Sequence, residues 1–159
     1  MRRYTAVILI AVLLLSLLGC AKSTGTATAN FYYCSATPEY HKQTSVMQVE
    51  TRKVDTNLSD LEGVLRLYFE GPGSQKLVSP FPVGTQLKTV QSSKEVTAVV
   101  LSDEIGTLSG VELMIACACL AATVIEISQS EIIQIRAETA LLNNQEFIEF
   151  TAQSLLSFS

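Results

Sequence analysis

The chain of 159 residues contains no tryptophan and a single histidine, His41. It also has no Gly-x-Ser-x-Gly motif, the turn that presents the nucleophilic serine of many hydrolases. His41 lies near Glu39 in a polar segment, where a solvated side chain is the simplest interpretation. The adjacent acids Asp103 and Glu104 could act in acid–base chemistry, but before a helix they more simply supply the negative charge that a helix N-terminus favours. We therefore expect no catalytic residues.

Positive charge is also scarce, with 11 Lys and Arg against 15 Asp and Glu. Loss of Arg2 and Arg3 with an N-terminal signal would leave 9 against 15, a net charge of −6. A chain of that sign offers no basic patch to neutralise phosphates, so nucleic acid is not an expected partner. It also has no polybasic segment that would bind anionic lipid, so attachment to a membrane would require an anchor of another kind.

Cysteine is present at four positions, and two of them, Cys117 and Cys119, are two residues apart. On a helix such side chains point about 200° apart, so they cannot share one metal ion or bridge each other. Zinc typically needs four ligands at spacings such as Cys-x2-Cys, and no second pair exists. We expect no metal and no cofactor. Cys34, Cys117 and Cys119 are either free, behaving as small apolar side chains, or include one disulfide from Cys34 to Cys117 or to Cys119.

The N-terminus has the layout of a bacterial lipoprotein signal. Two arginines precede 13 residues without charge, residues 6–18, and then Gly19 and Cys20. That run is too short to span a hydrocarbon core, which needs about 20 helical residues, but it suits a signal peptide. We predict a signal over residues 1–19, a lipidated Cys20 at the cell membrane on its extracytoplasmic face, and a flexible tether over residues 20–29. An uncleaved anchor is the alternative.

The rest of the chain, residues 30–159, is long enough for one domain with its own core. Capping-box patterns, Ser followed three residues later by Glu, place helix starts at Ser59 and Ser109. Gly71 and Pro72 end the first helix. The pattern predicts strands over residues 30–35, 45–54, 85–91, 95–101 and 131–136, helices over 61–70 and 110–127, a loop over 76–85, and a short strand or helix turn over 145–150.

The second helix carries the most apolar run outside the N-terminus. Residues 113–125 have no charge, but 13 residues are too few for a transmembrane helix. A helix that is apolar nearly all round is instead buried on most sides, and its alanines would let strands approach closely. The element order predicts an α+β fold, a two-layer sandwich in which a mixed or antiparallel sheet carries both helices on one face.

Four motifs follow one another along the chain: residues 67–72 (LYFEGP), 79–85 (SPFPVGT) and 99–104 (VVLSDE), then 113–116 (LMIA) with Leu120 and Thr123. Together they resemble one family, the GerMN domain of sporulation and spore germination proteins. The resemblance covers residues 30–136. It implies a small α+β domain carried by exported or lipid-anchored bacterial proteins, without established catalysis, that serves binding or assembly in the envelope and is similar in fold to ring-building domains of secretion channels.

The loop rich in proline is the candidate binding or assembly surface, made of Ser79, Pro80, Phe81, Pro82, Gly84 and Thr85. Phe81 either plugs the core or is an exposed contact for a peptide, a glycan or another protomer. We expect a non-catalytic module that associates with itself or with other envelope proteins. The alternatives are an enzyme acting on peptidoglycan through His41 with Asp103 or Glu104, and a monomeric lipoprotein that captures a ligand.

Overall fold

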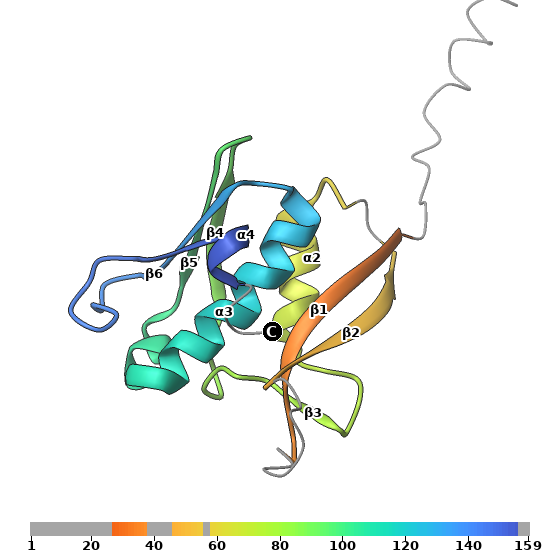
Figure 1. Cartoon of the computed structure of the whole chain (residues 1–159), viewed down its shortest axis with the longest axis horizontal. Helices are drawn as coiled ribbons and strands as arrows, with labels where there is room; N and C mark the ends of the chain where they lie inside the picture. The colour runs from red at the N-terminus through yellow and green to blue at the C-terminus, as the bar shows by residue number, and fades with distance from the viewer. Residues whose placement is uncertain (1–26, 38–45, 56–57, 156–159) are drawn as a thin grey trace, which may run out of the picture.

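The computed structural model describes residues 27–37, 46–55 and 58–155, which form two sheets and the helices packed with them (Figure 1). The predicted signal, Cys20 and His41 lie outside the described residues. Along the chain the elements are β1 (Ala27–Ser35), β2 (Met47–Val54), α2 (Leu61–Phe69), β3 (Leu77–Val78), β4 (Leu87–Ser92), β5 (Val96–Leu101), η1 (Asp103–Thr107), α3 (Gly110–Ser128), β6 (Ile132–Ala137), β7 (Ile148–Thr151) and α4 (Ala152–Leu155).

The first sheet has the strand order β2-β1-β3 and is antiparallel. β1 pairs with β2 from Ala27 opposite Val54 to Cys34 opposite Met47. The strand therefore starts three residues before the predicted position, because Ala29 is buried and pairs with Arg52. β3 lies within the segment predicted as loop and pairs only with the end of β1.

The second sheet has the order β4-β5-β6-β7. β4 and β5 form the predicted antiparallel hairpin, whose turn is closed by Ser93 N–H donating to the Val96 carbonyl at 2.9 Å. β5 and β6 are parallel, which requires a crossover connection. η1 and α3 supply that crossover, so the long helix is fixed to this sheet at both of its ends.

α3 lies between the two sheets, with β1 on one side and β6 and β7 on the other (Figure 1). Nine of its side chains are buried, among them Leu113, Cys117, Leu120 and Val124. Among the described helices α3 is long and apolar enough to cross a membrane by length and composition, but 56% of its most apolar 18-residue stretch is buried in this domain. The prediction of a core helix is confirmed.

The predicted α+β sandwich is confirmed, with a difference in how the strands are divided. They form two sheets instead of one, because α3 occupies the space between β1 and β6 and prevents their backbones from pairing. α2 packs against β4 and also contacts α3. Its buried stripe is the predicted one, Leu61, Val64, Leu65 and Tyr68.

The helix caps differ from the predicted capping boxes. The N-cap of α2 is Asp60, whose carboxylate accepts from the Gly63 N–H at 3.0 Å, and not Ser59. Gly63 permits this contact because a Cβ at that position would lie 2.5 Å from the Asp60 carboxylate. Ser109 is the N-cap of α3, but its side chain makes no cap bond. The Asn143 side chain accepts from the Gly110 N–H at 3.2 Å in its place.

Candidate functional site

The loop from β3 to β4 contains the predicted binding surface, and the structure places the Phe81 ring in the core and not on the surface. Phe81 is 8% exposed. Its ring centroid lies 5.2 Å from that of Phe69 and 6.2 Å from that of Tyr68, in tilted and edge-on arrangements that aromatic rings prefer. The ring therefore fastens the loop to the C-terminal end of α2.

The rest of the loop turns outward around this anchor. Thr85 N–H donates to the Pro82 carbonyl at 3.1 Å, and Gly84 has a φ of 94°, a left-handed conformation that favours glycine. Val83, between them, is completely exposed. The loop thus presents one apolar side chain at a fixed position next to its buried anchor. Ser79 and Gly84 are also exposed, Pro80 and Pro82 are half-buried, and Thr85 is buried.

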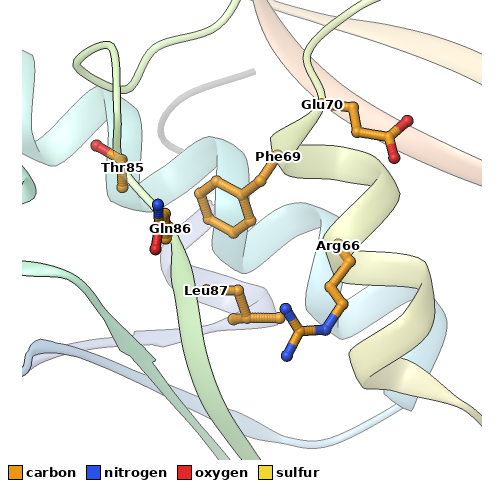
Figure 2. A pocket seen from close by; sticks show the side chains of 6 residues that line it. All are labelled: Arg66, Phe69, Glu70, Thr85, Gln86 and Leu87. Carbon is orange, nitrogen blue, oxygen red and sulfur yellow. The ribbon is translucent and has the colours of Figure 1, made fainter.

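A groove of about 250 Å³ opens where this loop enters β4, against the last turn of α2. Its lining residues are Arg66, Phe69, Glu70, Thr85, Gln86 and Leu87 (Figure 2). Figure 2 shows the Phe69 and Leu87 side chains facing each other, with the Arg66 guanidinium beside Leu87 and the Glu70 carboxylate turned away. The floor of the groove is apolar and its edge is charged.

Two polar groups of the groove differ in how they are satisfied. The Arg66 guanidinium donates to the Glu62 carboxylate at 2.7 Å, an exposed pair of the kind that contributes little stability. The Thr85 hydroxyl oxygen is buried and has no hydrogen-bond partner within the described part of the chain. Sequence reasoning included Thr85 but missed Val83 and the residues of α2, since only the fold brings α2 beside the loop.

A half-buried cation, Arg52, supports the same end of α2. The Arg52 guanidinium carbon lies 4.2 Å from the centre of the Phe31 ring, and one terminal nitrogen donates to the Tyr33 hydroxyl at 2.8 Å. Another donates to the Gly71 carbonyl, directly after α2, at 3.3 Å. Tyr33 stacks on Tyr68 with ring centres 4.8 Å apart. Burial raises the pKa of both tyrosines well above the usual value, so both are neutral structural groups.

The candidate acid–base groups have structural partners. Asp103 accepts from the Thr139 hydroxyl, from the Thr139 N–H at 2.7 Å and from the Ala140 N–H at 3.0 Å. These bonds lower the pKa of Asp103, and a hydrogen bond to Ser102 lowers the pKa of Glu104. Both carboxylates are ionised acceptors at neutral pH, the state opposite to that of a general acid.

The three described cysteines, Cys34, Cys117 and Cys119, carry free thiols. Burial raises the pKa of Cys117 to about 12, so this thiol is inert at neutral pH. No group of three or more His, Cys, Asp or Glu side chains within residues 27–37, 46–55 and 58–155 is arranged to hold a metal ion.

A second depression, of about 620 Å³, lies over the N-terminal half of α3 and the start of β7. It is lined by Met114, Gln145, Glu146, Phe147, Ile148 and Glu149. Phe147 is 43% exposed here, and two carboxylates share the lining. The depression is open to solvent, unlike the enclosed pockets that bury most of a small ligand.

Comparison with known proteins gives a family and a fold. The family model described as Germane, sporulation and spore germination, matches residues 21–140. The tandem GerMN domains of the sporulation protein GerM from Bacillus subtilis are similar in structure, with a TM-score of 0.61 over 84% of this chain at 13% identity. The match covers 48% of the Bacillus chain, so this chain spans about half of its length.

A second solved structure is a Clostridium perfringens protein provisionally described as a lipoprotein. It is 17% identical, with a TM-score of 0.49 over 88% of this chain and 97% of the other. No curated protein is significantly similar to this chain in sequence.

Proposed function

We propose that this chain, which belongs to the sporulation and spore germination family, is a non-catalytic binding or assembly module that a lipid on Cys20 holds on the outer face of the cell membrane. The order of Arg2, Arg3, an apolar run and Gly19-Cys20 supports the anchor. Each methylene of an acyl chain contributes about 0.8 kcal/mol of membrane binding, so two or three chains suffice for stable attachment.

The observation that carries the proposal is the contrast between neighbours in the loop of residues 79–85. Phe81 is buried against α2, whereas Val83 is completely exposed two residues later. A pre-ordered loop loses little conformational freedom on binding, which favours affinity. The groove with the apolar floor of Phe69 and Leu87 continues this surface, because Thr85 belongs to both. We name Val83 together with the groove the loop–groove surface.

The loop–groove surface suits a protein partner better than a small ligand. The groove has a volume of about 250 Å³, which is below the roughly 300–1,000 Å³ of ordinary ligand pockets. An exposed valine beside a shallow apolar floor instead resembles a patch that a partner's side chains complete. The Bacillus relative carries tandem GerMN domains, and a second copy of this chain, or another envelope protein with such a domain, would supply the equivalent neighbour.

The peptidoglycan-enzyme alternative depended on His41 with Asp103 or Glu104. Asp103 instead accepts three hydrogen bonds from Thr139 and Ala140 and so fixes the segment after β6. This use of the carboxylate favours a binding module over an enzyme. Muralytic activity that disappears in Asp103→Asn, with the fold retained, would reverse that preference.

Site-directed photo-crosslinking tests the binding surface. A photoreactive amino acid replaces Val83 in the full chain, expressed in its own membrane, and the matched control replaces Val49, which is 52% exposed on β2 of the other sheet. We expect a discrete crosslinked product from position 83 only. Its mass identifies a second copy or another envelope protein. Equal products from both positions, or none from position 83, would refute the proposed surface.

Mass spectrometry of the membrane-extracted chain tests the anchor independently. We expect an N-terminus at Cys20 carrying diacylglycerol, and release of Cys20→Ser from the membrane. An intact Met1 start with unmodified Cys20 would contradict the lipid anchor, whatever the crosslinking shows.

A further inference from the structure

β1 and α3 lie side by side in a regular register of polar contacts. The Asn30 side chain donates to the Glu126 carboxylate, and the Tyr32 hydroxyl donates to the same carboxylate at 2.9 Å. The Tyr32 N–H donates to the Thr123 hydroxyl at 3.0 Å. Two residues along a strand advance about 6.6 Å, and one helical turn of three to four residues advances about 4.5–6 Å. The next pair after Asn30 with Glu126 and Tyr32 with Thr123 is therefore Cys34 with Cys119.

The two thiols are near enough to interact, with the Cys119 S–H as donor, an interaction that lowers the pKa of Cys34 and raises the pKa of Cys119. The backbones are also close at this crossing, because a single short side chain, Thr123, bridges from the helix to the strand N–H. A disulfide joins Cα atoms about 4.4–6.8 Å apart, the separation that one short side chain on each element spans.

Cys117 does not compete for Cys34. It lies two residues before Cys119 on α3, on the opposite side of the helix, and belongs to the main apolar core. The sequence left two pairings open, Cys34 with Cys117 and Cys34 with Cys119. The structure favours the pairing of Cys34 with Cys119.

We propose that Cys34 and Cys119 are a redox pair that closes to a disulfide between β1 and α3 in an oxidising environment. This inference rests on the proposed function in one respect, the export that would bring the chain into such an environment. The bond would join the first strand to the core helix, across many residues of sequence, which is where a cross-link restricts the unfolded chain most.

The two sulfurs differ in access, and this gives the order of the reaction. Cys34 is half-buried and reachable from solvent, whereas Cys119 is fully buried. The hydrogen bond from Cys119 lowers the pKa of Cys34, and the same contact raises the pKa of Cys119. Cys34 is therefore the sulfur that meets an external disulfide first, and Cys119 is the resolving thiol.

The exchange balances with a disulfide as the oxidant, either small or carried by a protein. The Cys34 thiolate attacks one sulfur of the donor disulfide, forms a mixed disulfide and releases one donor thiolate. Cys119 then loses its proton to solvent, attacks the Cys34 sulfur and releases the second donor thiolate. Two protein thiols are oxidised by two electrons, and one donor disulfide is reduced to two thiols.

Thiol mapping in glutathione redox buffers tests the proposal. The full chain is purified with Cys20→Ser in every variant, so that only the three domain cysteines contribute. Thiols are alkylated after the chain is unfolded in denaturant, because Cys117 and Cys119 are buried in the fold. We expect oxidised glutathione to remove two of the three alkylatable thiols, to lower the intact mass by two hydrogens and to yield one cross-linked peptide pair containing Cys34 and Cys119. Reduction should then lower the thermal midpoint of unfolding.

Matched variants keep the test decisive. Cys117→Ser should still lose two thiols on oxidation. Cys34→Ser, at a half-buried position, should lose none, and reduction should then leave its thermal midpoint of unfolding unchanged. Full alkylation of Cys34 and Cys119 in every buffer, or a peptide pair containing Cys117, would overturn the proposal. A pair that closes in glutathione but is reduced on intact cells would support the pair and overturn the outward orientation of the proposed function.

Discussion

Replacement of Phe81 measures how strongly the loop of residues 79–85 depends on its anchor. The ring is 8% exposed and packs on Phe69 and Tyr68. Burying a phenylalanine contributes about 1.5–3 kcal/mol through transfer from water, and the cavity left by truncation adds to this. Such changes cost about 3–5 kcal/mol in total. Since the loop is at the surface and can partly collapse, we expect Phe81→Ala to lower the free energy of unfolding by about 3 kcal/mol.

Urea unfolding of the purified chain measures the effect, with an unchanged m-value showing that the two end states are the same. Phe81→Leu, which keeps most of the volume, should cost less than about 1.5 kcal/mol. Val83→Ala, at a completely exposed position, should stay within about 0.5 kcal/mol. If Phe81→Ala lost no more than Val83→Ala while changing self-association, the ring would be a contact and not an anchor, and the reasoning would fail.

Three further predictions concern the fold around the site, and each is tested by equilibrium unfolding. Asp60→Ala should lower the free energy of unfolding by about 1 kcal/mol because the Asp60 carboxylate caps α2. Ser109→Ala should lower it by no more than about 0.5 kcal/mol because the Ser109 side chain makes no cap bond. Equal losses would contradict the assigned caps. Arg52→Lys should cost about 1–3 kcal/mol, because lysine cannot both cover Phe31 and reach the Tyr33 hydroxyl and the Gly71 carbonyl; additivity with Tyr33→Phe would argue against their contact. Asp103→Asn should destabilise the chain at pH 7, and the difference in unfolding free energy from the parent should vanish in acid. The pKa of Asp103 is lowered in the fold, so its stabilising effect is complete above the ordinary pKa of about 3.9 and is lost as the pH falls through the native pKa. A difference that does not change with pH would show that the ionised carboxylate is not its cause.

Local patterns in the sequence predicted most of the elements. The stripe of Leu61, Val64, Leu65 and Tyr68 identified α2 and its buried face. The length of the apolar run in α3 identified a core helix, and the structure supplies the reason, since β1 and β6 cover it on two sides. These predictions succeeded because period and length are set by the residues of one segment alone.

What the sequence did not predict depends on contacts between distant segments. Asp60 caps α2 because Gly63 has no Cβ to obstruct its carboxylate, and Asn143 reaches the start of α3 from the far side of β6. The groove could not be predicted either, because Phe69 and Leu87 belong to elements that only tertiary packing brings together. No local sequence pattern predicts that the Arg52 guanidinium packs on the Phe31 ring.

The position of β1 has a mechanical consequence. Any attachment at Cys20 enters the domain through Ala27, the first residue of β1. A load directed along that strand acts on the whole ladder with β2, from Ala27 opposite Val54 to Cys34 opposite Met47, and on the contacts with α3 at the same time. These bonds share the load in shear and do not open one after another. Resistance to pulling is then governed by the rate of unfolding and not by the equilibrium stability.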